Sequence, residues 1–419
     1  MRGVRSYKMA ILKGNAVVGQ SGGPTAAINA TLAGVILGAK ELRAEGVIET
    51  LYGMRNGIEG FLQERLVNLT ERFESDSDVE LLKNTPAAAL GSCRKKLKSY
   101  EVDAETYAKL LSIFKKYNIR YFFYIGGNDS MDTVHKLSEY ASAHDYEMRV
   151  VGVPKTIDND LMATDHTPGF GSAAKFVAVT VKEIIRDVEV YTMDAVTVVE
   201  IMGRDAGWLT ASAALAGVSD GRGPALVYLP ERVFDKDKFI RDVKLAIEKN
   251  PGVLVAASEG IRFADGSYVG EGIEGSKLDA FGHKQLSGVG KVLEGIVKNE
   301  IGCKVRSIEL SLTQRCASHI ASRTDIDESV KIGAAATRAA ANGESGVMMI
   351  FVRGEGEYSV EIKSADISKI ANAARSVPDE YINSESNGIT EAGINYLLPL
   401  IEGEVAPVYE NGLPKHIII

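Results

Sequence analysis

Cysteine and histidine are scarce in this sequence, which has three cysteines and six histidines in 419 residues. Cys93, Cys303 and Cys316 have no paired spacing, so neither a zinc site built from cysteine pairs nor a disulfide framework is expected. The histidines form no HExxH motif and no pair at helical spacing, which argues against a metal site built from histidine.

Long apolar runs and an excess of basic residues are also missing. No run of about eighteen apolar residues occurs, so no membrane span is predicted. The first residues, MRGVRSYKMAILKG, lack the apolar stretch of a signal peptide. The formal net charge of −8 disfavours sequence-independent binding to nucleic acid. We therefore expect a cytoplasmic protein whose partners include neither membrane nor nucleic acid.

Short aliphatic runs alternate with longer amphipathic stretches along the whole chain. Nearly continuous apolar runs suit parallel strands that are covered on both faces. The strands expected on this ground are Ala16–Gly19, Tyr121–Ile125, Val150–Val153, Val196–Met202, Ala225–Leu229, Val253–Ala257, Ser307–Leu312 and Val347–Val352. Between them, residues 174–190 repeat Val and Ile at helical spacing. The alternation indicates an α/β fold with mainly parallel sheets, arranged either as two sheets or as one barrel.

Several of these strands end in turns that are rich in glycine. The first runs into GQSGGPT, residues 19–25, where Gly22 and Gly23 would let the backbone approach an anion at a helix start. A tight turn without a ligand explains this motif equally well, and it is not a Walker A loop. The turn GSCR presents Arg94, whose guanidinium suits phosphate oxygens. Taken alone, that motif is better explained by a solvated surface arginine.

Carboxylates follow two further strands. One turn, residues 126–130, reads GGNDS, and the other, residues 154–160, reads PKTIDND. Asp and Asn are ordinary turn residues, so a capping role is the simplest explanation. Asp158 and Asp160 beside Lys155, at the exit of a buried strand, indicate a functional site instead.

Charged residues also follow the later strands. The turn MGRDAGW contains Arg204, Glu259 follows GVLVAAS, and Arg306 and Arg315 flank SIELSLTQ. Packing alone would explain the methionine and tryptophan of the first of these turns. Acids and arginines thus gather at strand ends in a chain that is acidic overall.

Together these motifs resemble the phosphofructokinase family, and within it the pyrophosphate-dependent type. The resemblance rests on SGGPTAAIN, GSCR, GGNDS, PKTIDND, TPGFGSAAK, MGRDAGW, SEGI and FGHKQLSGVG, which stand in the family's order over about residues 16 to 320. It implies the phosphofructokinase fold: two similar Rossmann-like α/β domains with mainly parallel sheets and the active site between them. The phosphoryl-donor domain would comprise residues 1–170 and about 316–378, and the sugar-phosphate domain about 171–315 and 379–419.

The resemblance also implies roles for the matched residues. Asp158 would be the general base that takes the proton from the sugar 1-hydroxyl, while Arg94 and Arg204 would neutralise the transferring phosphoryl group. The residues expected to bind substrate are Gly22, Gly23, Thr156, Asp160, Met202, Gly203, Glu259, Arg306 and Arg315. Of these, Arg306 would reach the sugar phosphate of a neighbouring subunit in a homodimer or homotetramer. Mg²⁺ is the expected cofactor, with Asn128 and Asp129 as its residues.

Asp129 and Lys155 would select the phosphoryl donor and take part in catalysis. ATP-using members of the family usually carry glycine at both positions, whereas pyrophosphate users resemble this chain. A carboxylate about 4 Å from a phosphate oxygen of ATP costs roughly 4 kcal/mol at an effective dielectric constant of about 20, or about three decades of affinity. Lys155 would supply positive charge to the phosphate leaving group.

Three positions depart from the family pattern. Asn128 stands where the family more often has a second Asp, so less negative charge would face the metal. Ala195 replaces an arginine that ATP-using members contribute from a neighbouring subunit, and Leu312 replaces a polar residue of the sugar site. An unregulated dimer is the simplest expectation.

The predicted activity is the reversible transfer of a phosphoryl group from pyrophosphate to the 1-hydroxyl of fructose 6-phosphate. It would give fructose 1,6-bisphosphate and phosphate, a step of glycolysis. An ATP-dependent 6-phosphofructokinase and a noncatalytic sugar-phosphate-binding regulator are the alternatives. A nicotinamide-dependent dehydrogenase is disfavoured because no GxGxxG follows the first strand.

Overall fold

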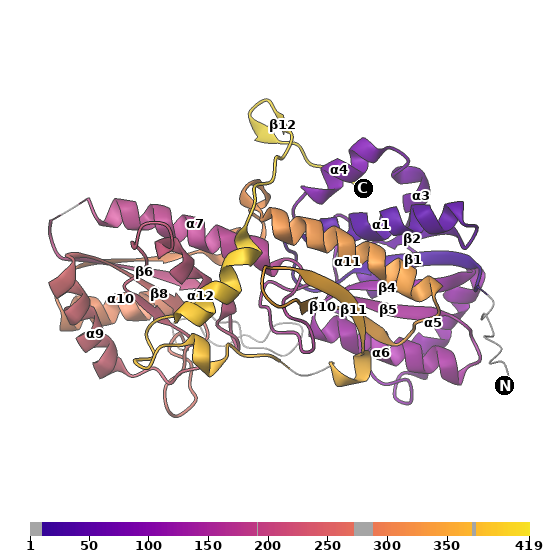
Figure 1. Cartoon of the computed structure of the whole chain (residues 1–419). Helices are drawn as coiled ribbons and strands as arrows, with labels where there is room; N and C mark the ends of the chain where they lie inside the picture. The colour runs from indigo at the N-terminus through magenta and orange to yellow at the C-terminus, as the bar shows by residue number, and fades with distance from the viewer. Residues whose placement is uncertain (1–10, 191, 272–287, 371–373) are drawn as a thin grey trace, which may run out of the picture.

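Two sheets, each covered by helices, form two lobes that lie side by side (Figure 1). The computed structural model describes residues 11–190, 192–271, 288–370 and 374–419. Most of the predicted motif FGHKQLSGVG lies outside these residues. Within the described ranges, no helix is both long enough and apolar enough to cross a membrane.

The first lobe is built on a seven-stranded sheet with the order β11-β10-β5-β4-β1-β2-β3. Its strands are β1 (Gly14–Gln20), β2 (Ile48–Met54), β3 (Leu66–Asn68), β4 (Ile119–Gly126), β5 (Arg149–Pro154), β10 (Val347–Arg353) and β11 (Val360–Asp366). The five inner strands run parallel, while β3 and β11 are antiparallel at the two edges. Apolar runs such as IRYFFYIG in β4 are buried because helices cover both faces of the sheet.

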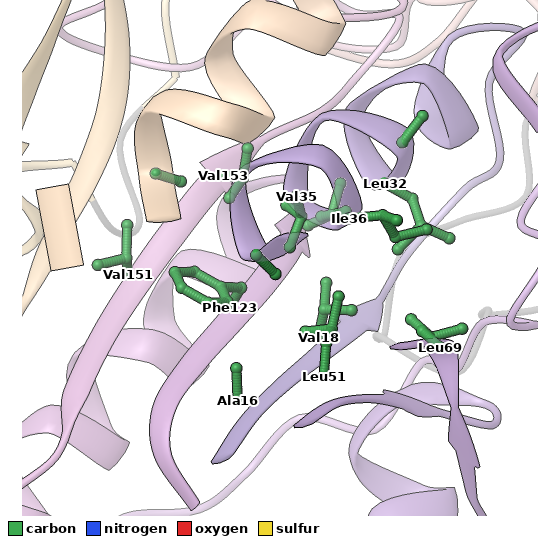
Figure 2. Packing of buried hydrophobic residues seen from close by; sticks show 14 of the residues in the cluster. Ala16, Val18, Leu32, Val35, Ile36, Leu51, Leu69, Phe123, Val151 and Val153 are labelled. Carbon is green, nitrogen blue, oxygen red and sulfur yellow. The ribbon is translucent and has the colours of Figure 1, made fainter. Parts of the chain in front are cut away.

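Helices cover this sheet closely. They are α1 (Ile28–Ala44), α2 (Gly57–Leu62), α3 (Leu69–Arg72), α4 (Asp76–Lys83), α5 (Ala104–Lys116), α6 (Asn128–Ala143) and α11 (Arg323–Ala341). Figure 2 shows Leu32, Val35 and Ile36 of α1 packed over Val18 and Phe123 of the strands. This packing fixes the sheet whose strand ends carry the first group of predicted site residues.

The second lobe is smaller and entirely parallel. Its strands, in the order β7-β8-β6-β9, are β7 (Leu226–Tyr228), β8 (Gly252–Ser258), β6 (Ala195–Ile201) and β9 (Lys304–Glu309). Its helices are α7 (Phe170–Val188), α8 (Trp208–Ser212), α9 (Lys236–Lys249) and α10 (Val289–Glu300). Two mainly parallel sheets, rather than one barrel, confirm the predicted fold class.

Every strand expected from the sequence is present, with one marked shift. The strand expected at 307–312 is β9, which ends at Glu309 because Ser311–Arg315 form a 3₁₀ turn. The strands β2, β3 and β11 were not expected, since they lie at or near a sheet edge and mix polar with apolar residues. The helix expected at 174–190 begins four residues earlier, at Phe170, and ends at Val188.

The end of the chain touches both lobes. The helix α12 (Glu391–Leu397) packs against α8, and a short hairpin, β12 (Tyr409–Glu410) with β13 (Leu413–Pro414), extends from the body (Figure 1). The last residues form no strand, but Ile417 packs into the core of the first lobe. We propose the predicted division into two domains with this one change, that the final residues belong with the first lobe.

Candidate active site

A cavity of about 300 Å³ lies where strand ends of the two sheets meet. The strands β1, β5, β6 and β8 all end beside it, as expected for ligand sites at the carboxyl ends of parallel strands. The predicted site residues in its lining are Gly23, Arg94, Lys155, Thr156, Asp158, Asp160, Met202, Arg204, Glu259 and Arg315. Pro24, Thr25, Ile157, Asp205 and Ala206 complete the lining.

The remaining predicted residues stand outside this lining. Gly22 adjoins it, since a Cβ there would lie 3.4 Å from the Lys155 ammonium. Gly203 donates its N–H to Glu259 over 3.2 Å. Arg306 is half-exposed on β9, 4.0 Å from Asp187, and is not brought to this cavity. That Arg306 serves a neighbouring subunit stays a prediction.

Lys155 is the most deeply buried cation of the site, with 2% of its surface exposed. Its ammonium donates a hydrogen bond of 2.6 Å to the carbonyl of Gly23, which ties the end of β5 to the turn after β1. Burial is the main cause that lowers the pKa of Lys155 to about 8; Asp158 and Asp160 oppose this shift, and the positive charges of Arg315 and Arg94 add to it. An anion bound here would stabilise the charged form.

The loop after β5 carries both aspartates into the cavity. The backbone N–H of Asp158 donates to the hydroxyl of Thr156 over 3.1 Å, a turn that fixes the start of the loop. Burial raises the pKa of Asp158. Burial and the charge of Asp158 raise the pKa of Asp160 to about 7. Asp160 can therefore exchange a proton near neutral pH, and burial shifts the pKa of Asp158 in the same upward direction.

The turn GGNDS, residues 126–130, includes the start of α6 and contacts this loop. The amide of Asn128 donates to Asp160 over 3.3 Å, while its buried Oδ1 accepts no hydrogen bond from any residue that the structure describes. Asp129 forms an ion pair of 3.1 Å with Lys96. Lys96 was missed by the sequence analysis, because a run of lysines usually marks a solvated surface.

These groups offer oxygen ligands to a divalent metal ion. Mg²⁺ takes oxygen ligands and is usually bound through one or two carboxylates together with substrate phosphates. In the described part of the chain, no group of three or more His, Cys, Asp or Glu residues could hold a metal ion by itself. The unpartnered Oδ1 of Asn128 and the carboxylates of Asp129 and Asp160 supply the few oxygen atoms that such a site needs.

The second lobe adds arginines and one more acid. The Ser258 hydroxyl donates to the carbonyl of Gly203 over 2.5 Å, which holds the MGRDAGW turn against the end of β8. Burial raises the pKa of Glu259 to about 7. Arg204 has a buried Nε without a partner among the described residues, and Arg315 has its pKa lowered by burial and by Arg94.

The cavity thus gathers cations and proton-exchanging acids from both lobes. Lys155, Arg204 and Arg315 are at least partly buried, and together with the exposed Arg94 they would repel one another without an anion between them. Acids with raised pKa values beside such cations suit a site where a proton and a charged group move together. A second cavity, of about 490 Å³, lies between α7 and α9 and contains none of the predicted residues.

Comparisons with known proteins identify the family of this chain. The phosphofructokinase family model matches residues 15–340, and the chain belongs to the phosphofructokinase family. A pyrophosphate–fructose 6-phosphate 1-phosphotransferase of Xanthomonas campestris pv. campestris (strain B100) is 43% identical over 408 residues, 96% of each chain. A sulfofructose kinase of Alkalicoccus urumqiensis is 30% identical over 368 residues, 87% of this chain and 91% of that one.

Solved structures show the same likeness. The crystal structure of a pyrophosphate-dependent phosphofructokinase from Nitrosospira multiformis has a TM-score of 0.87 and 38% identity, covering 97% of this chain and 96% of that one. A Pichia pastoris phosphofructokinase in the T-state has a TM-score of 0.65 at 18% identity, covering 86% of this chain and 38% of that one. The latter likeness concerns the fold alone.

Proposed function

We propose that this chain transfers a phosphoryl group from pyrophosphate to the 1-hydroxyl of fructose 6-phosphate, reversibly, giving fructose 1,6-bisphosphate and phosphate. The observation that carries the proposal is the meeting of Lys155 with Asp158 in one cavity lined by arginines from both lobes. The full-length relatives named as pyrophosphate–fructose 6-phosphate 1-phosphotransferases support it.

In this mechanism Asp158 accepts the proton of the sugar 1-hydroxyl as that oxygen attacks the phosphorus atom. Its raised pKa lets it return the proton in the reverse direction. Lys155, Arg94 and Arg204 stabilise the negative charge of the phosphoryl group and of the leaving phosphate. Asn128, Asp129 and Asp160 would hold Mg²⁺, which when bound would draw negative charge away from the phosphate oxygens.

The choice of donor is proposed to rest on Asp129 together with Lys155. Asp129 stands in the first turn of α6, where a longer donor would place additional phosphate and nucleoside groups. Its ion pair with Lys96 reduces the repulsion that an isolated carboxylate would exert. Steric exclusion by the Asp129 side chain therefore adds to its charge in disfavouring ATP.

The proposed chemistry is tested by replacing Asp158 with asparagine. Because the amide keeps the shape but cannot accept the proton, we expect kcat to fall by at least about 10²–10⁴-fold, with fructose 6-phosphate binding largely kept. The control is Asp205→Asn, since Asp205 also lines the cavity but forms an ion pair with Arg262. Full turnover by the Asp158→Asn enzyme would contradict the assignment of the base.

Further properties of the enzyme are part of the proposal. The metal would be Mg²⁺, the location cytoplasmic, and the assembly a homodimer or homotetramer in which Arg306 contacts a neighbouring subunit. Pyrophosphate and fructose 6-phosphate would be the small-molecule substrates, and the reaction would serve glycolysis.

A further inference from the structure

The loop after β5, residues 155–160, is called the catalytic loop. It contains a backbone conformation that must be held by contacts with other parts of the chain. Asn159, between the two aspartates, has a φ of 54°, in the left-handed region that residues other than glycine rarely adopt. This turn separates Asp158 from Asp160 and so decides where each carboxyl group points. Such a conformation costs of order 1–3 kcal/mol and persists only where surrounding contacts hold it in place.

The side chain of Arg375 holds this turn from a distant part of the chain. One guanidinium nitrogen donates to the carbonyl of Asn159 over 3.2 Å, and the other donates to the carbonyl of Asp165 over 2.6 Å. The backbone N–H of Arg375 donates to the carbonyl of Asp160 over 2.8 Å. The neighbouring residue, Ala374, forms an antiparallel bridge with Leu161. Arg375 and Ala374 therefore contact the loop and the residue after it through their backbone, and Arg375 contacts the loop through its side chain as well.

Tyr396 of α12 forms hydrogen bonds with both Asn159 and Arg375. Its hydroxyl accepts hydrogen bonds from the side chain of Asn159, at 3.0 Å, and from Arg375, at 3.1 Å. It donates to the carbonyl of Asp165 at 2.6 Å. Both partners of the turn thus come from beyond residue 370, outside the part of the chain, 15–340, that the family model matches.

The same segment is tied to the active-site turn of the second lobe. The indole N–H of Trp208 donates to the carbonyl of Arg375 over 3.1 Å, and the guanidinium lies 4.5 Å from the Trp208 ring centre. The carboxylate of Glu231 accepts hydrogen bonds of 2.9 Å from both Gly207 and Val377. Gly207 and Trp208 are the last two residues of the turn MGRDAGW, which carries Arg204.

We infer that Arg375 is a positioning residue of the active site. It holds Asp158 and Asp160 in place, and it fixes the position of their loop in the first lobe relative to the turn MGRDAGW in the second lobe. The inference rests on the proposed function for its kinetic consequence. Arg375 itself touches neither the cavity nor a reacting atom. Its planar fork reaches the carbonyl of Asn159 and the carbonyl of Asp165 at the same time, which a lysine cannot do.

The test compares Arg375→Lys with Arg353→Lys. Arg353 is a matched control, because it is also half-buried and stacks on Tyr396, yet bonds the side chain of Asp165 and no carbonyl of residues 156–160.

We expect Arg375→Lys to lower kcat by about 100-fold, as a displacement of about 1 Å does. Its KM for fructose 6-phosphate should stay within about threefold of the wild-type value, since only the chemical step is disturbed. Arg353→Lys should keep its kcat, whatever its Tm. Added guanidinium should restore part of the kcat of Arg375→Ala.

Amide hydrogen exchange at residues 158–162 gives a readout that does not depend on activity. We expect faster exchange there in Arg375→Lys and not in Arg353→Lys. Unchanged exchange, or equal losses of kcat in the two variants, overturns the inference. A wild-type protein that shows no turnover, while Arg375→Lys still loosens residues 158–162, overturns the proposed function and leaves the positioning of the loop standing.

Discussion

At the scale of single residues, burial and neighbouring charges shift the pKa values of the groups that line the cavity. Lys155 loses hydration on entering the protein, and nearby arginines disfavour its charged form, so its pKa falls to about 8. The acids respond in the opposite direction, with the pKa of Asp160 and of Glu259 raised to about 7. Bound phosphates would neutralise the charge of the cations in this cavity, and a magnesium ion would neutralise that of the acids. Such pKa shifts are therefore typical of a site that binds anions.

These pKa values predict a narrow, bell-shaped dependence of kcat/KM on pH. Asp160 must be ionised, so activity should be lost as pH falls below about 7, and Lys155 must be protonated, so activity should be lost as pH rises above about 8. The Lys155→Arg variant, which stays charged, should keep its remaining activity at higher pH. A wild-type profile that is flat from pH 6 to pH 9, about one unit beyond each pKa, would contradict these assignments.

Some of these residues could be found from the sequence, and others could not. Asp158 and Lys155 were predictable because they follow an apolar strand directly, and parallel strand ends share one edge of a sheet. Lys96 and Arg375 were not, because their partners lie far away in the sequence and become neighbours only when the chain folds. Neither a lysine run nor a lone arginine carries a local signal for such contacts.

At the scale of elements, α1 and α11 approach each other unusually closely in the first lobe. A Cβ on Gly34 would lie 2.0 Å from the backbone carbonyl oxygen of Val330, and one on Gly333 would lie 2.2 Å from that of Thr31. Small residues at this crossing let α11, although late in the sequence, pack beside α1. The apolar runs predicted most strands of the two sheets. The pairing of α1 with α11 could not be predicted in this way, because neither helix carries a local sequence signal for its partner.

Adding a methyl group at this crossing should be costly. We expect Gly34→Ala to lower the free energy of unfolding by about 1–3 kcal/mol, because a rigid backbone atom must move. The matched control is Gly295→Ala in α10, where a Cβ would meet no heavy atom within 4 Å. That change should raise stability by about 0.5–1 kcal/mol, through lower entropy of the unfolded chain. Denaturant midpoints that move the same way for both variants would argue against the close crossing.

At the scale of the whole molecule, the site depends on two lobes that the chain visits more than once. The first sheet takes strands from both ends of the sequence, and the last segment returns to bind both lobes. Residue patterns predicted parallel strands and the strand ends that bear the charged residues, and the family resemblance decided for two sheets over one barrel. They could not predict the segment around Arg375, whose hydrogen bonds join the two catalytic loops.

Because the anion site is shared between lobes, pyrophosphate should stabilise the whole fold. At a concentration of about 100 times its Kd, pyrophosphate should add about 2.7 kcal/mol to the free energy of unfolding. The rise in Tm should disappear in Arg315→Ala, which removes a lining cation, and should persist in Arg338→Ala, whose side chain pairs with Glu41 and Glu45 at the surface. Equal Tm shifts in the two variants would place the anion elsewhere.

The most direct measurement of the central claim is the formation of fructose 1,6-bisphosphate from fructose 6-phosphate and Mg²⁺, with either pyrophosphate or ATP as donor. We expect turnover with pyrophosphate, little or none with ATP, and a relative gain for ATP in the Asp129→Gly enzyme. Turnover with ATP alone would contradict the roles of Asp129 and Lys155 while keeping Asp158 as the base. No turnover with either donor would contradict the proposed function itself.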